Sequence, residues 1–379
     1  MSPVIKVPSR KGSGAINTSL ATEGYTKNAT SVPAAPPNMV LIDNISIVVL
    51  NWNGANDTLS CLHSLAALTY PRFNVILVDN GSTDDSLEFL RSYIPPYPLT
   101  FVETGRNLGY AGGNNVGIRY ALEQGAGFIL VLNNDTTVAP DLLERLLESA
   151  QRNSDAGVFS ARIMYFDEPE RVWFDGARWN PASLRLEWPG QGENEFSLDA
   201  SDHATDYACG AALFFRSEVA RQIGLLDESF FLVWEEVDWG FRARKAGWQN
   251  LVVPAAKVWH KIGVSFGSES SPLRTYFSIR NELLWFSRHA PFSARLRLWM
   301  KNLRRLIPRF SVDSGQSAWV RRMSWAVQDY VRAWLGRGNR VEYLAARRAI
   351  QDYVHRRLGN CPDEVRLWSK VWETQQRDV

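Results

Sequence analysis

Short runs of aliphatic residues recur along the first third of the chain, and each ends at polar residues. The runs cover residues 45–50, 75–78, 99–103 and 128–132. The run at 75–78 does not alternate polar and apolar residues, which is typical of a parallel strand buried on both faces. Helices are predicted over 57–68, 86–93, from the end of a loop at 105–115 to about 124, and over 140–151. This order predicts an α/β protein with a mostly parallel sheet flanked by helices.

The later part of the chain shows weaker patterns. We expect a strand near 211–215, a helix over 217–223, and a helix that begins after Trp234 and ends near Gly247. Residues 156–205 are aromatic and polar without a clear period, so they predict an irregular region with an antiparallel excursion. Beyond about residue 270 the spacing of apolar residues is helical.

The length of 379 residues exceeds the roughly 250 to 300 residues that one hydrophobic core usually serves. We predict a disordered leader over 1–38, an α/β catalytic domain over 39–270 and a basic, helical C-terminal region over 271–379. The leader is rich in Ser, Thr, Pro and Gly and lacks the apolar core of a signal peptide. Three widely spaced cysteines without a disulfide pattern are typical of a reducing compartment, which predicts a cytoplasmic protein.

Charge is distributed unevenly along the chain. Residues 1–290 carry 24 Lys and Arg against 32 Asp and Glu, whereas residues 291–379 carry 18 against 8. This asymmetry predicts an acidic catalytic body and a basic tail with an anionic partner. No stretch approaches the about 20 consecutive apolar residues that are needed to cross a bilayer.

Two acidic residues directly follow predicted strands. Asp79 ends the second run, and Asp135 closes the triplet Asn133-Asn134-Asp135 after the fourth run. Open α/β sheets bind their ligands at the carboxyl ends of the strands. Mg²⁺ usually keeps few protein ligands besides waters and substrate phosphates, so a single acid there could help to hold it. The alternative for both acids is a turn or helix-capping role.

Residues 105–115 are dense in glycine and contain one cation, Arg106. Backbone amides that glycine exposes at the start of a helix suit a diphosphate. The glycine spacing does not match the G-x-G-x-x-G pattern of dinucleotide-binding folds. The alternative is a loop whose glycines only serve turns with positive φ.

Three acids lie within four positions, at Glu235, Glu236 and Asp238, between Trp234 and Trp239. Clustered carboxylates repel one another, which raises the pKa of at least one of them unless a cation intervenes. Such a carboxylate can serve as a general base towards a sugar hydroxyl, and a tryptophan face can carry a sugar ring. The alternative is a helix N-terminus whose acids only complement the helix dipole.

His260 stands alone after Trp259. Neutral imidazole is a ready metal ligand, which makes His260 a candidate metal ligand. The alternative is a structural or solvated histidine.

Seven segments, taken in order, resemble glycosyltransferase family 2, the inverting enzymes of GT-A fold, and in particular its bacterial rhamnosyltransferase-like branch. They are 46–53, 78–84, 105–110 with 114–117, 132–135, 209–212, 234–238 and 259–260. The resemblance covers roughly residues 45–290. It implies a Rossmann-like GT-A domain that moves a sugar, rhamnose among others, from a dTDP- or UDP-sugar to a glycan or lipid-linked acceptor of the cell envelope.

The resemblance also implies roles for matching residues. Asp135 and His260 would hold the divalent cation, Mg²⁺ or Mn²⁺, under the donor diphosphate. Glu236 corresponds to the catalytic base, with Asp238 beside it. Acceptor contacts fall to Trp234 and Glu235. Donor contacts fall to Asn53, Asp79, Arg106, Asn107, Gly109, Asn114 and Asn134.

Two positions depart from the family pattern. Asn133 replaces the first acid of the Asp-x-Asp metal motif, which predicts weaker metal binding, and Glu236 stands where relatives usually have Asp. One alternative is therefore a nucleotide-sugar-binding scaffold that has lost catalysis. A nucleotidyltransferase is the other, but it needs a basic, glycine-rich loop after the first strand, which residues 51–54 lack.

The basic tail contains a predicted amphipathic helix over 293–310. Leu296, Trp299 or Met300, Leu303 and Ile307 share one face, and Arg and Lys residues lie on the others. This pattern is typical of a helix in the interface of an anionic membrane, here the inner face of the plasma membrane. The alternatives are packing on the catalytic domain or on a second copy of the chain. Nucleic acid is not expected as a partner, because no known nucleic-acid-binding module is present.

Overall fold

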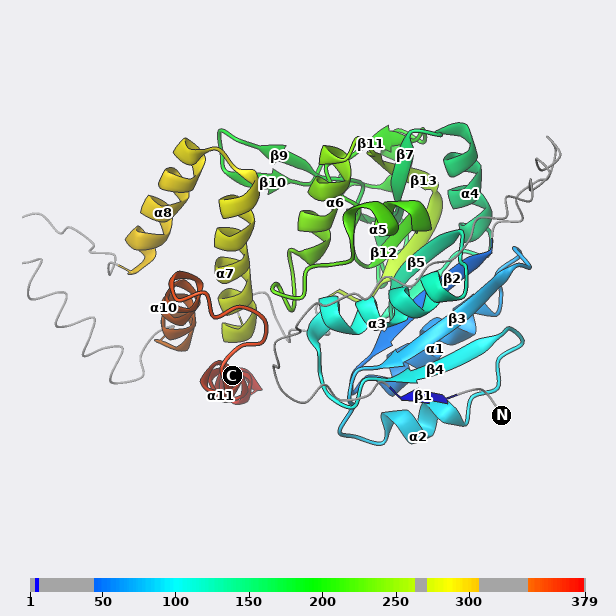
Figure 1. Cartoon of the computed structure of the whole chain (residues 1–379), viewed down its shortest axis with the longest axis horizontal. Coiled ribbons are helices and arrows are strands. Elements are labelled where there is room, and N and C mark those ends of the chain that lie inside the picture. Colours follow the sequence, from blue (N-terminus) through cyan, green and yellow to red (C-terminus); the bar gives the residue numbers. More distant parts are fainter. Residues whose placement is uncertain (1–3, 7–43, 263–270, 307–339, 378–379) are drawn as a thin grey trace, which may run out of the picture.

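The computed structural model describes residues 4–6, 44–262, 271–306 and 340–377, and a mixed sheet of eleven strands forms its centre (Figure 1). The main path of the sheet is, in spatial order, β1 (Val4–Lys6), β4 (Leu99–Glu103), β3 (Phe73–Asp79), β2 (Ile45–Asn51), β5 (Phe128–Asn133), β12 (Ala212–Arg216), β7 (Ala156–Tyr165), β13 (Gln249–His260) and β11 (His203–Ala204). The remaining strands are β6 (Thr136–Val138) beside β13, β8 (Val172–Phe174) beside β7, and a separate hairpin of β9 (Arg178–Asn180) and β10 (Arg185–Glu187).

The strands from β1 to β5 along this path are all parallel. β12 is antiparallel to both of its neighbours, and β7 and β13 are again parallel to each other. The predicted α/β fold with a mostly parallel sheet flanked by helices is confirmed. It follows from these pairings that β2, β3, β5 and β13 all point their carboxyl ends to the same edge of the sheet.

The prediction of an irregular region over 156–205 is wrong for its first ten residues, which form β7. This strand lies between β12 and β13, and all of its residues except Tyr165 are buried. A strand that is covered on both faces and paired on both edges shows no polar alternation, so its pattern is easily missed. The antiparallel excursion predicted there consists of β8 against β7 and of the β9–β10 hairpin.

Helices cover both faces of the sheet and form two hydrophobic cores. The first core contains α1 (Ala55–Leu65), α2 (Ser86–Arg91) and α4 (Leu142–Arg152), and the second contains α3 (Gly109–Glu123), α5 (Ser217–Ile223) and much of α6 (Glu235–Lys245). Within β2, Ile47 and Val49 belong to the first core, whereas Val48 belongs to the second. Strand residues thus point alternately into two apolar layers, which explains the unbroken aliphatic runs.

The predicted glycine-rich loop over 105–115 is too long, because helix α3 already begins at Gly109. A Cβ on Gly117 would lie 2.4 Å from Cγ1 of Val48, and a Cβ on Gly113 would collide with β2 in the same way. These glycines therefore allow close packing of the helix on the sheet. Gly109 differs from them, since its φ of 76° favours glycine at the helix start.

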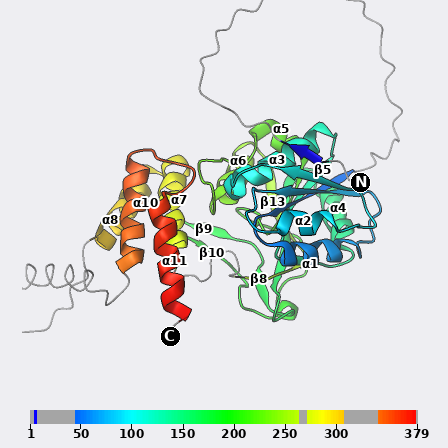
Figure 2. The same cartoon turned by 90° about the horizontal axis from the view of Figure 1, so that it is seen from below.

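Four described helices follow the sheet domain and form a layer beside it (Figures 1 and 2). They are α7 (Pro272–His289), α8 (Phe292–Leu306), α10 (Arg340–Val354) and α11 (Asp363–Arg377). Ser271 caps α7 through its Oγ, which accepts the backbone N–H of Arg274 at 3.2 Å. The ring of Trp285 in α7 lies 5.0 Å from that of Trp179 and 4.8 Å from that of Phe241. This aromatic contact joins the helical layer to the sheet domain.

The structure tests only parts of the terminal predictions. The disorder predicted over 1–38 does not apply to Val4–Lys6, because this apolar segment pairs with the exposed edge of β4. The rest of that leader, and residues 307–310 of the predicted membrane helix, lie outside the described residues. None of the described helices combines the length and the apolar character that a membrane span requires.

Candidate active site

Asp79 lies at the end of β3 and stabilises the turn that follows it. Its Oδ1 accepts hydrogen bonds from Asn51 Nδ2 at 3.1 Å and from Ser82 Oγ at 2.6 Å. Its Oδ2 accepts the backbone N–H groups of Gly81 at 3.2 Å and Ser82 at 3.1 Å. The two oxygens of a carboxylate can accept about four hydrogen bonds. The four bonds from Asn51, Gly81 and Ser82 therefore fill the acceptor capacity of Asp79. The predicted contact of Asp79 with the donor remains a prediction.

The loops after β2 and β3 are joined to each other. The backbone N–H of Asn53 donates to Ser82 Oγ at 3.0 Å, and its side-chain Oδ1 accepts the N–H of Thr83 at 2.8 Å. Asn53 has a φ of 52°, a conformation that asparagine tolerates better than most residues. Because Asn53 is exposed, it remains accessible to a ligand at this edge.

The glycine loop lies directly against the turn after Asp79. A Cβ on Gly81 would lie 2.4 Å from the Cα of Arg106, so the two backbones touch. Asn80 Nδ2 donates to the carbonyl of Gly109 at 3.1 Å, and Asn107 Oδ1 accepts the N–H of Gly109 at 2.8 Å. The structure therefore places the predicted donor residues Arg106, Asn107 and Gly109 beside the end of β3, with Arg106 exposed.

Two other predicted donor residues direct their amides into the protein. Asn114 is fully buried in α3, where its Nδ2 donates to the carbonyl of Tyr110 at 3.0 Å. Asn134 Nδ2 donates to Thr58 Oγ1 at 2.9 Å, and Thr58 Oγ1 donates in turn to Asn51 Oδ1 at 2.8 Å. Both residues thus support the site from within the protein, and Asn134 links the ends of β2 and β5. Their predicted contacts with the donor remain predictions.

Asp135 and His260 meet although 125 positions separate them in the sequence. β6, which follows Asp135 directly, pairs with the end of β13 and places Thr136 opposite His260. His260 Nε2 lies 3.1 Å from Asp135 Oδ1, and both side chains are largely buried. Within the described residues, that Oδ1 has no partner with hydrogen-bond geometry.

This pair fits a divalent cation. Neighbouring ligands of an octahedral Mg²⁺ at about 2.1 Å lie about 3.0 Å apart, close to the observed separation of the two atoms. No group of three or more His, Cys, Asp and Glu side chains that could hold a metal occurs in the part of the chain described here. Further ligands would therefore come from substrate phosphates and water, as is usual for Mg²⁺.

Asn133 and Trp173 complete the surroundings of His260. Asn133 Nδ2 lies 3.5 Å from His260 Nε2, and its Oδ1 is buried without a hydrogen-bond partner among the described residues. The ring of Trp173 lies 5.0 Å from the imidazole at an interplanar angle of 59°. Asn133 therefore offers this part of the site an uncharged amide. The resemblance to the family would place a negatively charged carboxylate at the same position.

Glu235 and Glu236 open helix α6. Glu235 is buried, Glu236 is partly exposed, and neither Oε2 has a hydrogen-bond partner in the described structure. Burial raises the pKa of Glu236 to about 7. Burial, and then the charge of Glu236, raise the pKa of Glu235 well above its usual range. A carboxylate with such a pKa is suited to general-base chemistry near neutral pH.

The acid pair and the Asp135 side of the site come together at Tyr110. The hydroxyl of Tyr110 donates to the carbonyl of Gly210 at 2.6 Å. Burial raises the pKa of Tyr110 well above its usual range, and the charges of Glu235, Glu236 and Asp135 add to this effect. Asp135, which follows β5, and the two acids of α6 therefore lie within electrostatic reach of one side chain at the start of α3.

Asp238 does not share this position. Its Oδ2 accepts from Arg242 Nε at 2.8 Å, and its Oδ1 lies 2.8 Å from His289 Nε2 and 3.3 Å from Arg288 Nη1. Burial raises the pKa of Asp238, but the hydrogen bond from His289 and the charge and hydrogen bond of Arg242 outweigh it, so that the pKa lies below its usual value. Residues two positions apart on a helix point to nearly opposite sides, so the catalytic role predicted for Asp238 is not supported.

Residues 46–224 match the family model described as Glycosyl transferase family 2. This part of the chain belongs to that family. The matched segment includes Asp79 and Asp135 but ends before α6, so Glu236 and His260 lie beyond it. The fold nevertheless brings His260 into contact with Asp135.

Several relatives of this family 2 protein carry the names of sugar transferases. The chain is 27% identical over 251 residues to the low-salt glycan biosynthesis hexosyltransferase Agl10 of Haloferax volcanii, over 64% of this chain and 76% of the relative. It is 28% identical over 250 residues to an N-acetylglucosaminyl-diphospho-decaprenol L-rhamnosyltransferase of Mycobacterium tuberculosis, over 60% and 80%. It is 23% identical over 304 residues to the dTDP-rhamnosyl transferase RfbF of Shigella flexneri, over 78% and 98%.

The fold is that of GT-A glycosyltransferases. The structure of GalNAc-T7 with UDP, GalNAc and Mn²⁺ is similar with a TM-score of 0.52 at 14% identity, over 66% of this chain and 48% of that chain. At this identity the similarity concerns the fold only.

Several residues of the candidate active site were not predicted from the sequence. Asn51 and Ser82 hold Asp79, and a signal for Asn51 existed, because it directly follows the first strand. Trp173 carried no local signal, since only the pairing of β8 with β7 brings it to His260. The predicted acceptor residue Trp234 is partly exposed and lies 5.6 Å, ring to ring, from Trp285, so part of its surface already contacts α7.

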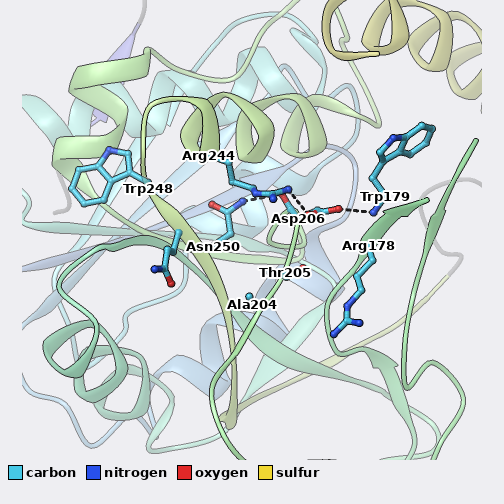
Figure 3. Close-up of a pocket in the computed structure, with 9 residues that line it drawn as sticks. Arg178, Trp179, Ala204, Thr205, Asp206, Arg244, Trp248 and Asn250 are labelled. Carbon is cyan, nitrogen blue, oxygen red and sulfur yellow. Dashed lines mark hydrogen bonds and ion pairs between the residues drawn. The ribbon is translucent and has the colours of Figure 1, made fainter. Parts of the chain in front are cut away.

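A cavity of about 550 Å³ lies at the other end of α6, away from these residues (Figure 3). Its lining comprises Arg178, Trp179, Ala204, Thr205, Asp206, Arg244, Trp248, Gln249 and Asn250. Gln249 and His260 are the two ends of β13, which spans about 36 Å at about 3.3 Å per residue. Arg244 and Asp206 form an ion pair within this cavity. It contains none of the predicted site residues.

Replacement of Glu235 tests how much the buried acid lowers the stability of the folded protein when it is ionised. Because its pKa is raised in the folded state, the stability that the protonated form provides is present below about pH 4.5 and is lost as the pH rises. We expect Glu235→Gln to raise Tm by about 2 °C or more at pH 8 but not at pH 4.5. Thermal unfolding followed by circular dichroism measures this, with the exposed Glu193→Gln as control. An equal gain at both pH values would contradict the assignment.

Proposed function

We propose that the protein is an inverting glycosyltransferase that moves a sugar from a dTDP- or UDP-sugar to a glycan or lipid-linked acceptor in cell-envelope polysaccharide synthesis. Rhamnose is the first candidate sugar, because two of the relatives carry rhamnosyltransferase names. The observations that carry the proposal are the acid pair at the start of α6, whose pKa values are raised, and the contact between Asp135 and His260. A base and a cation site around one point are what a single displacement on a sugar diphosphate requires.

In the proposed reaction Glu236 accepts a proton from the acceptor hydroxyl. The acceptor oxygen attacks the anomeric carbon from the face opposite the diphosphate, while the bond between that carbon and the diphosphate oxygen breaks. One displacement inverts the configuration, and no enzyme-bound sugar forms. Asp135 and His260 would hold Mg²⁺ or Mn²⁺, whose charge stabilises the leaving diphosphate.

The donor would lie along the ends of β2 and β3. Asn53 and Arg106 are exposed there, and Gly109 begins α3, whose N-terminus favours an anionic group. Asp79 would act mainly by fixing these loops, since its own acceptor capacity is used. Trp234 and Glu235 remain the proposed acceptor side, next to the base.

We further propose a cytoplasmic protein that contacts the inner face of the membrane through α8. Phe292, Leu296 and Met300 are 78%, 50% and 45% exposed and follow one another every four residues along this helix. The face that carries Ala294, Leu298 and Asn302 is buried, and the ring of Trp299 packs on that of Tyr353 at 5.7 Å, so Trp299 does not share the exposed face. Leu303 and Ile307 of the predicted face lie outside the residues whose side chains the structure describes.

Vesicle flotation tests the membrane contact. We expect the protein to float with vesicles of anionic phosphatidylglycerol, and Leu296→Ser with Met300→Ser to reduce binding at least about fivefold, because apolar area no longer enters the interface. The exposed Leu367→Ser on α11 is the control. Failure of the wild-type chain to float, together with a dimer in light scattering, would instead identify a second copy as the partner of this face.

The base assignment is tested by Glu236→Gln. We expect kcat to fall about 10²- to 10⁴-fold, because the amide cannot accept the proton, with the dissociation constant of the nucleoside diphosphate unchanged within about twofold. In the wild type, kcat/KM should decrease below about pH 7, where Glu236 becomes protonated. Release of nucleoside diphosphate in the presence of acceptor measures both. Near-normal turnover by Glu236→Gln would refute the assignment.

The cation site is tested by Asp135→Ala. Calorimetry of nucleoside diphosphate binding with and without Mn²⁺ should show that the metal-dependent part of the affinity disappears, since one of two protein ligands is lost. Asn133→Asp is the complementary variant and should strengthen that part, because it adds a carboxylate beside His260. Unchanged binding in both variants would exclude a cation at this position.

A further inference from the structure

The segment before α6 has an unusual backbone. Phe231, Val233 and Trp234 have φ angles of 64°, 59° and 79°. Residues other than glycine seldom adopt such angles, and a β-branched residue such as Val233 does so least readily. Residues 230–236 contain no glycine that would relieve the strain. The surrounding structure must therefore hold this segment in place.

Two adjacent residues of α7 provide this support. Asn281 Nδ2 lies 2.9 Å from the carbonyl of Phe230, 2.8 Å from that of Leu232 and 2.8 Å from that of Val233. Its two N–H hydrogens are thus shared among three backbone acceptors. Arg280 Nη2 donates to the carbonyl of Phe230 at 2.7 Å. Both side chains are fully buried, so water cannot replace them easily.

The far end of α7 holds the other side of the acid pair. His289 Nε2 and Arg288 Nη1 contact the carboxylate of Asp238, which lies two residues after Glu236. Glu235 and Glu236 are therefore enclosed between two points, Val233 and Asp238, that are both bound to the same helix. Their carboxyl groups also form hydrogen bonds with backbone groups of this segment, at Val233, Glu235, Glu236 and Val237.

The segment also contacts the donor side of the site. The carbonyl of Phe231 accepts the N–H of Ala111 at 3.3 Å, and a Cβ on Gly109 would lie 2.4 Å from this carbonyl oxygen. On its other side the ring of Phe231 stacks on Phe277 of α7 at 5.5 Å. The start of α3 and helix α7 thus touch through this one residue.

We propose that Arg280 and Asn281 are positioning residues, through which the C-terminal helical layer sets the orientation of the acid pair. This rests on the proposed role of Glu236 as base and extends it: α7 is part of the catalytic apparatus without contacting the substrate. The strained backbone fixes where the carboxylates point, and Asn281 contributes the hydrogen bonds that keep it strained.

The variant Asn281→Asp tests the proposal, because it keeps the shape of the side chain but replaces the donor by an oxygen that faces three carbonyls. We expect kcat to fall roughly 10- to 100-fold, since small displacements of a reacting group have effects of this size. The donor KM should stay within about twofold of the wild-type value. Asn281→Ser retains one hydrogen-bond donor, so its kcat should lie between those of the wild type and of Asn281→Asp. It replaces Asn281→Asp in the test if that variant does not fold.

Ser369→Ala is the matched control. Ser369 lies on α11, and its Oγ accepts the backbone N–H of Leu273 at 2.8 Å, so the variant removes a buried contact at the start of α7, two turns before Asn281. It should lower Tm while kcat stays at the wild-type value. If the Asn281 variants lose no more kcat than this control, or if kcat and donor KM change together, the proposal is overturned.

Hydrogen exchange separates this proposal from the proposed function. Backbone amides of residues 231–236 should exchange faster in Asn281→Asp than in Ser369→Ala, whatever reaction the protein performs. A wild-type chain that transfers no sugar would refute the function and leave this result intact. Equal exchange in both variants would refute the positioning role, even in an active enzyme.

Discussion

Two carboxyl groups buried next to each other at the start of α6 are the constraint on which the arrangement of this site depends. Burial raises the pKa of both Glu235 and Glu236, and the described structure offers their Oε2 atoms no hydrogen-bond donor. Their hydrogen bonds are to backbone groups of the same segment, at Val233, Glu235, Glu236 and Val237. Their position therefore has to come from the backbone, whose strained segment is held by Asn281 on one side and by the ion pairs of Asp238 on the other. The helical layer is therefore needed to hold this backbone segment, and with it the two acids, in position.

The second part of the site depends on the direction of the strands. β13 runs in the same direction as β5, and β6 turns back along its end, so that His260 reaches Asp135. At the neighbouring strand ends, Asn51 links the turn at Asp79 to Thr58. Loops that carry binding residues are thus fixed by buried polar contacts, which limits the reorganisation needed when a charged ligand binds.

Much of the fold could be predicted from local pattern, because buried strands and amphipathic helices have short periods. The helix over 217–223 has the predicted bounds, and the four early strands lie where the aliphatic runs predict them. β7 could not be recognised, since a strand buried on all sides has no alternation. The glycines of α3 were misinterpreted for a related reason: Gly117 serves a contact with Val48, which is distant in sequence.

Of the site, the sequence by itself determined the chemical inventory: acids after predicted strands, a glycine-rich helix start, a cluster of acids and a lone histidine, in an order that resembles one enzyme family. The tertiary structure alone decided which of these act together. It separated Asp238 from Glu236, saturated the hydrogen-bonding capacity of Asp79, paired Asp135 with His260, and placed Asn281 against the backbone that leads to the acid pair. The physical reason is that pKa, hydrogen-bond satisfaction and backbone strain depend on which distant groups approach and exclude water, and no local pattern contains this information.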